Sequence, residues 1–211
     1  MSTVVDEVRI GGRSLRIERP AAADALLDEE AFAGDEFLPY WAELWPSGIA
    51  LARHVAALDV RGRDVLEVGC GLGLPAIAAA LAGGRVLATD WAPDALPLAA
   101  ANARLNGAEM SVELIDWRRP HTLGGRRFDL VLAADVLYEQ RNATPLAELL
   151  DAVVAPGGEA LVADPGRRHA PSFLTLVTAG GWRIDTRAIE ELPRGGVHRL
   201  WRDRHEIGAF P

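Results

Sequence analysis

The fold is decided by one stretch of nine residues, Val65-Leu66-Glu67-Val68-Gly69-Cys70-Gly71-Leu72-Gly73. A short apolar run ends in three glycines at alternate positions, and a helical pattern follows. Glycines let the backbone turn tightly and approach a ligand without a Cβ in the way. The stretch predicts a strand, a turn and a helix, with a ligand outside the carboxyl end of the strand. The alternative is a tight turn with no ligand.

Apolar runs and helical patterns alternate along the rest of the chain. Strands are predicted at 64–69, 85–90, 110–115, 128–134 and 159–163, and helices at 74–82, 93–105, 144–154 and 170–179. Two last strands, 182–189 and 197–204, are joined by 193–196 without a helix and are expected to form an antiparallel edge pair. Upstream, Gly11-Gly12 predicts a β-hairpin, and Ser47 is expected to cap a helix that runs to Leu58. We therefore expect an α/β protein with a Rossmann-like, doubly wound sheet of seven strands, mostly parallel with an antiparallel edge strand, plus the N-terminal hairpin.

Length and composition limit the class of protein. The chain has 211 residues and a formal net charge of -8, and its 22 basic residues are all arginine. One globular domain is expected, with a hairpin and connector (1–36) packed on a core (37–211). The acidic balance argues against nucleic-acid binding, and one cysteine with five histidines argues against a disulfide framework or a metal site. With neither a signal-peptide pattern nor a membrane-spanning apolar stretch, a cytoplasmic protein with no membrane partner is expected.

The spacing of the glycines separates two classes of cofactor. A dinucleotide fingerprint, G-x-G-x-x-G, would need its third glycine at Leu74, whereas the chain has it at Gly73. Glu67, two residues before the first glycine, suits a cationic ligand and would repel a pyrophosphate. This pattern resembles the first motif of methyltransferases that use S-adenosylmethionine (SAM).

Two carboxylates end the next two strands at the same edge of the predicted sheet. Asp90 lies 21 residues after Gly69, where a carboxylate can accept both ribose hydroxyls of an adenosine. Asp116 can meet the adenine amino group, and Trp117 can stack on the ring. The alternatives are a helix cap for Asp90 and a turn residue for Asp116.

The region from Tyr40 to Trp182 resembles the class I, seven-strand methyltransferases that use SAM. A finer resemblance is to the family 16 group of protein-lysine methyltransferases, and three motifs carry it: Pro-Tyr-Trp-Ala-Glu-Leu-Trp-Pro-Ser-Gly at 39–48, Asp116-Trp117, and Ala134-Asp135-Val136-Leu137-Tyr138, which matches the D-x-x-Y motif of the group. Within the group, the chain is similar to bacterial enzymes related to the lysine methyltransferase of the electron-transfer flavoprotein β subunit, often labelled nicotinamide N-methyltransferase-like.

The resemblance implies a cofactor site for SAM, with S-adenosylhomocysteine as the product. Trp45 would close over the cofactor, Trp91 would cover the adenine, and Trp41 or Tyr40 would line the substrate entrance. Alternatively, the tryptophans form an aromatic core and Cys70 packs in the turn. The implied cofactor residues are Trp45, Glu67, Gly69, Cys70, Gly71, Gly73, Asp90, Trp91, Asp116, Trp117 and Ala134.

Asp135 and Tyr138 are the expected catalytic residues. A lysine ammonium has no lone pair and an ordinary pKa of about 10.4, so it must lose a proton before it attacks a methyl group. A carboxylate raises the pKa of a neighbouring amine, so Asp135 is expected to position the amine and pass its proton to water. Tyr138 is expected to bind the amine or line a lysine channel. The alternatives are a turn cap for Asp135 and simple packing for Tyr138.

The leading hypothesis is methyl transfer from SAM to a lysine side-chain amine of a protein, with the electron-transfer flavoprotein β subunit as a candidate partner. The alternatives are an N-methyltransferase acting on a small amine and a catalytically silent SAM-binding module. The absence of lysine fits the codon usage of a GC-rich genome, and it also fits an enzyme whose substrate is lysine.

Overall fold

The computed structural model describes residues 2–22, 39–116, 119 and 123–203. In these ranges seven strands form one sheet: β3 (Asp64–Val68), β4 (Arg85–Asp90), β5 (Ser111–Leu114), β6 (Phe128–Ala134), β7 (Val154–Asp164), β8 (Arg183–Ile189) and β9 (Leu192–Trp201). Their spatial order is β5-β4-β3-β6-β7-β9-β8. The chain runs outward from β3 to β5 and then returns to the other side of β3 at β6, which makes β3 and β6 the point where the winding reverses.

Five neighbouring strands of the sheet, β5 to β7 in spatial order, pair in parallel, and the antiparallel pairing is at one edge, as predicted. β9 pairs antiparallel with both β7 and β8, so the reversed strand lies one position inside the edge and β8 is outermost. The expected connection at 193–196 is wrong, because these residues belong to β9. A Cβ on Gly195 would collide with the carbonyl oxygen of Asp164, so this glycine permits a close strand approach.

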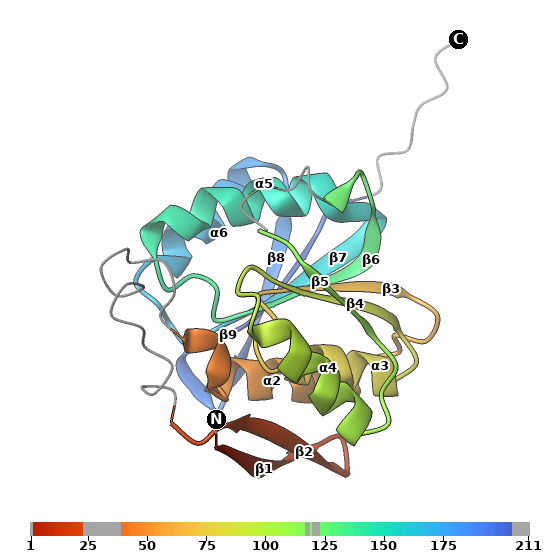
Figure 1. Ribbon diagram of the computed structural model, residues 1–211. Coiled ribbons are helices and arrows are strands. Elements are labelled where there is room, and N and C mark those ends of the chain that lie inside the picture. Colours follow the sequence, from red (N-terminus) through yellow and green to blue (C-terminus); the bar gives the residue numbers. More distant parts are fainter. Residues whose placement is uncertain (1, 23–38, 117–118, 120–122, 204–211) are drawn as a thin grey trace.

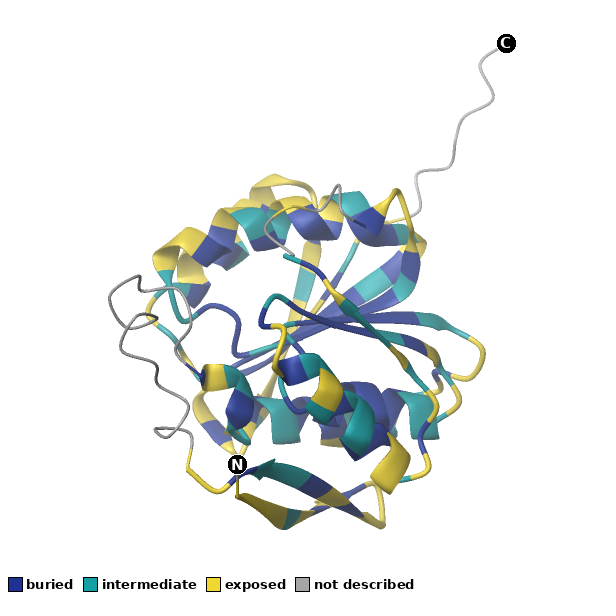
Figure 2. Ribbon diagram, viewed as in Figure 1, coloured by how far each residue is buried: buried dark blue, intermediate teal, exposed yellow. Residues whose placement is uncertain are grey.

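Helices cover both faces of the sheet (Figure 1). On one side lie α5 (Ala143–Val153) and α6 (Ala170–Ala179), and on the other lie α2 (Pro46–Ala56), α3 (Leu74–Leu81) and α4 (Ala95–Leu105). Successive side chains of β6 alternate between the two layers: Leu130 and Leu132 pack toward α2 and α3, and Val131 packs toward α5 and α6. Both sheet faces are therefore buried, and Figure 2 shows the central strands as the most buried part.

The start of α2 differs from the prediction. Helix α2 begins at Pro46 and has no side-chain cap, and the hydroxyl oxygen of Ser47 is buried without a hydrogen-bond partner in the described structure. Proline is favourable in the first turn of a helix because its missing N–H needs no partner there. The helix is thus started by Pro46 and not by a Ser47 cap.

The N-terminal hairpin has the predicted form. β1 (Thr3–Ile10) pairs in register with β2 (Arg13–Pro20) through Gly11 and Gly12, which both have positive φ. The hairpin lies outside the helix layer of α2 and α4 (Figure 1), and its inward side chains are buried there: Val8, Ile10, Leu15 and Ile17.

Two asparagines at the end of α4 connect this hairpin to the core. Asn106 accepts from the Arg16 N–H and donates to the Arg16 carbonyl (2.9 and 2.7 Å), and Asn102 does the same with Glu18 (2.7 and 3.0 Å). The Asn102 amide also donates to the carbonyl of Leu72, in the glycine turn (3.1 Å). The amides therefore satisfy the free edge of β2 as a neighbouring strand would.

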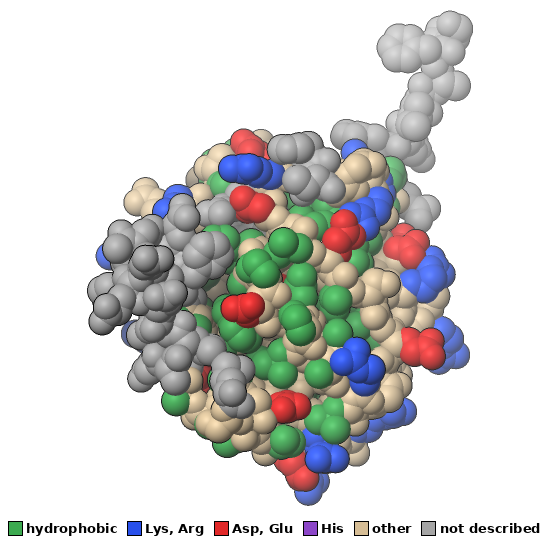
Figure 3. All heavy atoms as spheres, viewed as in Figure 1, with side chains coloured by type: hydrophobic (Ala, Val, Ile, Leu, Met, Phe, Trp, Pro, Cys, Tyr) green, Lys and Arg blue, Asp and Glu red, His purple; other side chains and the backbone are tan. Residues whose placement is uncertain are grey.

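The surface carries mixed charge. On the face shown in Figure 3, hydrophobic side chains gather at the centre, and acidic side chains and arginines lie close to one another around them. No helix among the described residues is long and apolar enough to cross a membrane.

Candidate active site

A cavity of about 380 Å³ lies at the carboxyl ends of β3, β4, β6 and β7. This is where the winding of the sheet reverses, the position at which open α/β sheets bind their ligands. The cavity is lined by residues of the glycine turn, of the three neighbouring strand ends and of the segment from η2 (Tyr40–Ala42) into α2: Tyr40, Trp41, Glu43, Leu44, Trp45, Gly48, Glu67, Gly69, Cys70, Gly71, Leu72, Leu74, Pro75, Asp90, Trp91, Ala92, Ala134, Asp135, Val136, Tyr138, Glu139 and Arg167.

The glycine turn has the geometry that the sequence predicts. Gly69 and Gly71 have φ values of 64° and 50°, which glycine adopts at little cost. A Cβ on Gly71 would lie 2.9 Å from the carbonyl oxygen of Trp41, so the turn and η2 are in direct contact. Gly69 is therefore required by the turn alone, and Gly71 is required by both the turn and the close approach of η2.

Gly73 lies apart from the cavity, and its predicted role in cofactor binding stays a prediction. It does not line the cavity, and a Cβ there would lie 3.2 Å from the Cβ of Ala99 and 3.3 Å from the Cε of Met110. Gly73 has a φ of 82° at the start of α3 and allows α3 and α4 to pack closely. The geometry therefore supports a packing role for this glycine.

Glu67 lines the cavity from the carboxyl end of β3, and it is 1% exposed. Its Oε2 accepts a hydrogen bond from the N–H of Ala76 in the first turn of α3 (2.8 Å). Burial raises the pKa of Glu67 well above its ordinary value. The side chain therefore caps α3, and it is a weaker source of negative charge than the sequence argument for a cationic ligand assumes.

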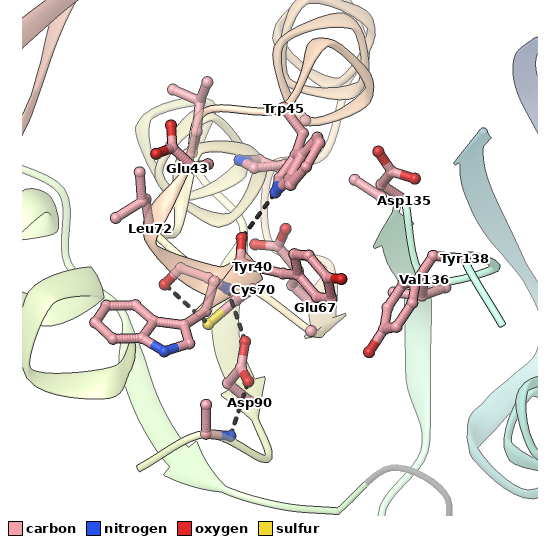
Figure 4. Close-up of a pocket in the computed structure, with 18 of the residues that line it drawn as sticks. Tyr40, Glu43, Trp45, Glu67, Cys70, Leu72, Asp90, Asp135, Val136 and Tyr138 are labelled. Carbon is pink, nitrogen blue, oxygen red and sulfur yellow. Dashed lines mark hydrogen bonds between the residues drawn. The ribbon is translucent and has the colours of Figure 1, made fainter. Parts of the chain in front are cut away.

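Asp90 is tied to the glycine turn. Its Oδ2 accepts from the N–H of Gly71 (2.8 Å) and its Oδ1 from the N–H of Ala92 (2.9 Å). Burial raises the pKa of Asp90 above its ordinary value. The carboxylate lines the cavity beside Trp91, and since a carboxylate can accept about four hydrogen bonds in all, it can still accept one from a ligand. Figure 4 shows Asp90 on one side of the site, with Asp135 and Tyr138 on the other.

One other predicted cofactor residue, Asp116, lies apart from this group. Asp116 follows the outermost strand β5, does not line the cavity, and forms an ion pair with Arg119 (3.6 Å). Its assignment to the adenine amino group stays a prediction. Trp117 lies outside the described residues. Cys70 does line the cavity, but burial raises the pKa of its thiol well above the ordinary value, so it is not an activated nucleophile.

Asp135 follows β6 in a strained conformation. Its φ of 56° is the only positive value of a non-glycine residue in the described chain, and its peptide N–H donates to the carbonyl of Ala163 (2.9 Å). Strained residues of this kind cluster at functional sites because the surrounding structure must hold them. The Asp135 side chain lines the cavity, on the same side as Tyr138 (Figure 4).

An aromatic wall faces Asp135. The rings of Tyr40 and Tyr138 lie 5.6 Å apart between centroids, and those of Tyr40 and Trp45 lie 6.2 Å apart at 67°. The indole N–H of Trp45 donates to the carbonyl of Tyr40 (2.7 Å), which fixes the ring (Figure 4). Trp45 and Tyr138 therefore line the same cavity, and their roles toward cofactor and substrate stay predictions.

Arg167 is the site residue that the sequence did not indicate. Its Nε donates to Oδ1 of Asp135 (2.8 Å), and its guanidinium carbon lies 5.9 Å from the centroid of Trp45. It follows Asp164-Pro165-Gly166 at the carboxyl end of β7, and Oδ1 of Asp164 accepts from the N–H groups of Gly166 and Arg167 (2.8 Å each). The signal in the sequence was its place just after a strand, at the same edge as the other site residues.

Comparison with known proteins identifies the family. The profile of the lysine methyltransferase family matches residues 40–179, which include all of the cavity residues. The chain belongs to the lysine methyltransferase family. The expected family resemblance is thereby confirmed.

Relatives of this lysine methyltransferase family member are about one-third identical to it over the aligned residues. It is 36% identical over 139 residues to the electron transfer flavoprotein beta subunit lysine methyltransferase of Rattus norvegicus, an alignment that covers 61% of this chain and 51% of that protein. It is 31% identical over 131 residues to the EEF1A lysine methyltransferase 3 of Mus musculus, covering 60% and 56%. The chain spans about half the length of these curated relatives.

Solved structures confirm the expected fold of the family member. The ribosomal protein L11 methylase of Lactobacillus delbrueckii subsp. bulgaricus is 27% identical with a TM-score of 0.58, covering 72% of this chain and 77% of that chain. The magnesium protoporphyrin IX methyltransferase of Synechocystis PCC 6803, solved with bound SAM, is 19% identical with a TM-score of 0.59, covering 74% and 78%. Both have the Rossmann-like methyltransferase fold.

Proposed function

We propose that the chain transfers a methyl group from SAM to a lysine side-chain amine of a protein. The observation that carries this proposal is that one cavity joins the glycine turn and Asp90 to the D-x-x-Y pair, Asp135 and Tyr138. Both halves lie within the region that matches the lysine methyltransferase family.

The cavity residues fit SAM. Gly69 and Gly71 provide a backbone surface without side chains, and Asp90 provides buried carboxylate oxygens for ribose hydroxyls. Trp91 and Trp45 provide aromatic surface on the same cavity. Among the described lining residues, acidic side chains outnumber basic ones even without the buried Glu67, which suits a ligand and an acceptor that both carry positive charge: Glu43, Asp90, Asp135 and Glu139 against Arg167.

The remaining task of the protein is to prepare the amine. SAM supplies an electrophilic methyl group and a neutral thioether leaving group when it is bound. Asp135 orients the amine through a hydrogen bond, and the proton of the ammonium passes to water before transfer. The rings of Tyr40, Trp45 and Tyr138 favour the neutral amine by removing water from around it. Holding the reacting atoms in line provides much of the acceleration.

The acceptor we propose is a protein. Tyr40, which lines the cavity, is 46% exposed, so the cavity reaches the surface where a lysine of another protein can enter. The relatives are named for protein acceptors, among them the electron transfer flavoprotein beta subunit. That subunit is the candidate partner that we propose to test first.

Incubation with SAM carrying a tritiated methyl group tests the proposal. The protein is added to a cell lysate, and also to purified electron-transfer flavoprotein β subunit, and the products are separated by gel and by filtration. A labelled protein band other than the enzyme is the expected result. Label only in the small-molecule fraction would instead indicate a small-amine methyltransferase, and no label despite measurable SAM binding would indicate a silent binding module.

Asp135→Ala is the matched variant for this experiment. It removes the carboxylate that orients the amine and leaves Asp90 and the glycine turn in place, so it is expected to bind SAM and to abolish labelling. Asp94→Asn, which changes an exposed carboxylate outside the cavity, is the control and is expected to label normally. Full activity in Asp135→Ala would remove Asp135 from the mechanism.

A further inference from the structure

The only cation among the described cavity residues is already bound to Asp135. Arg167 forms an ion pair with it, 2.8 Å from Nε to Oδ1, while the carboxylate is 7% exposed and the guanidinium 37%. The neighbouring carboxylate raises the pKa of Arg167 further above its ordinary value. Arg167 therefore stays charged, and it offsets the charge of Asp135 before any substrate enters.

A free carboxylate at this position would oppose the reaction. An unpaired Asp135 beside a lysine would favour the ammonium form, because an opposite charge within a few ångströms stabilises a charged group. The ammonium form has no lone pair and cannot attack a methyl group. A residue that orients the amine by hydrogen bonding must therefore do so without presenting a full negative charge.

We propose that Arg167 is a positioning residue that neutralises Asp135, so that the second carboxylate oxygen, Oδ2, orients the substrate amine without retaining its proton. This inference rests on the proposed function. It assigns a role to Arg167, the one basic residue among the described residues that line the cavity.

The loop that carries Arg167 is built to hold it in place. Gly166 has a φ of 92°, and a Cβ there would lie 2.5 Å from the carbonyl oxygen of Arg194, so the loop is packed against β9. Oδ1 of Asp164 accepts the N–H groups of Gly166 and Arg167, and Asp164 is 1% exposed. The contact of the guanidinium with the Trp45 ring fixes the other end of the side chain.

No other described group at the site can replace this charge. The remaining titratable groups around Asp135 come from residues 40–43, from β3 and the glycine turn, from β4, from the turn after β6 and from the end of β7, and each is a carboxyl, a phenol or a thiol: Tyr40, Glu43, Glu67, Cys70, Asp90, Tyr138, Glu139 and Asp164. Asp164 also acts electrostatically on both members of the pair, and as a second carboxylate it adds to the need for a cation.

The pH profile of methyl transfer tests the inference. The rate of labelling of the acceptor band is measured from about pH 6 to about pH 11, which extends past the ordinary lysine pKa of about 10.4 and so includes the upper part of the profile. In Arg167→Met the uncompensated Asp135 raises the pKa of the bound amine, so the rising part of the profile moves to higher pH. A shift of about one unit is expected, which lowers the rate about tenfold at pH 7 and lets it recover at alkaline pH.

Two further variants separate charge from packing. Arg167→Lys keeps a positive charge and is expected to restore most of the wild-type profile. Because this variant introduces a lysine into the enzyme, label on the enzyme's own band is excluded from the rate. Arg85→Met makes the same chemical change at an exposed ion pair with Asp64, at the amino ends of the strands, and is expected to leave the profile unchanged. SAM affinity is measured by calorimetry for every variant and is expected to stay within about twofold of wild type, because Arg167 acts on the amine side.

Four outcomes would overturn the inference. A profile of Arg167→Met that superimposes on the wild type, or a rate lowered equally at every pH, would reduce Arg167 to a structural residue. A large loss of SAM affinity would place it in the cofactor site instead. In these three cases the wild type still labels its acceptor and the proposed function stands. Failure of the wild type itself to label any acceptor would remove the proposed function, and this inference with it.

Discussion

Asp90 has two roles at the scale of a single residue. Its carboxylate holds the turn through the N–H groups of Gly71 and Ala92, and it faces the cavity where we propose the ribose binds. Because hydrogen bonds to a charged group contribute about 1.5–3 kcal/mol, Asp90→Ala is expected to weaken SAM binding about 10- to 100-fold. Isothermal calorimetry measures this directly. An unchanged affinity would show that Asp90 serves the turn alone.

Glu67 gives a prediction about stability and pH. Its pKa is raised in the folded protein above the unfolded value of about 4.3, so the folded state binds more protons between those two values. Stability therefore falls in this window as the pH rises. Glu67→Gln keeps an acceptor for the Ala76 N–H and does not titrate, so its free energy of unfolding relative to wild type is expected to increase from about pH 5 to about pH 8. Urea unfolding at the two pH values measures the difference, and parallel behaviour of the two proteins would contradict it.

The sequence predicted site residues where strand ends and motif spacing coincided. Asp90 and Asp135 each lie at the end of an apolar strand, and the cavity brings them together. The assignment of Gly73 to the cofactor site stays a prediction, and the sequence alone does not reveal that a methionine and an alanine pack against this glycine. Arg167 was missed because its place just after a strand is a weak signal among 22 basic residues that are all arginine.

At the scale of elements, the contact between η2 and the glycine turn is the tightest constraint on the site. Gly71→Ala would put a Cβ 2.9 Å from the Trp41 carbonyl oxygen and force an alanine to a φ of 50°. Such a position costs about 1–3 kcal/mol from backbone strain alone, and the collision adds to it. A lower melting temperature and weaker SAM binding are expected.

A matched control exists for this variant. Gly107 has a φ of 67°, and a Cβ added there would meet no atom within 4 Å, so Gly107→Ala imposes similar backbone strain without a collision. It is expected to lower the melting temperature less than Gly71→Ala and to leave SAM binding unchanged. Equal effects of the two variants on both measurements would mean that the approach of η2 is unimportant.

Elements were easier to predict than their junctions. The strands and helices around the glycine turn agree with the pattern to within a few residues, because burial on both sheet faces leaves long apolar runs. The sequence predicts a connection at the Gly-Gly pair 195–196, but the pair lies within β9, because a turn and a close approach of two backbones both favour glycine. Only the position of the Asp164 carbonyl, which comes from a distant part of the chain, decides between them.

At the scale of the whole molecule, the absence of lysine leads to a prediction about self-modification. Arginine supplies the cation in the described ion pairs of the site and the sheet, and the sequence contains no lysine side chain to methylate. Mass spectrometry of the protein after incubation with SAM is expected to show no side-chain amine methylation, while a partner protein gains mass in steps of one methylene. A methylated arginine on the enzyme would show that the acceptor class is broader than lysine amines.

Asn102 couples the N-terminal hairpin to the glycine turn. The buried Asn102 amide makes hydrogen bonds with the backbone of β2 and with the carbonyl of Leu72, so one side chain connects the hairpin to the glycine turn. Any ligand that steadies the turn makes opening of the hairpin less favourable by the same linkage. We therefore expect the hairpin to open less often when the cofactor is bound, although the hairpin lies on the outside of the molecule.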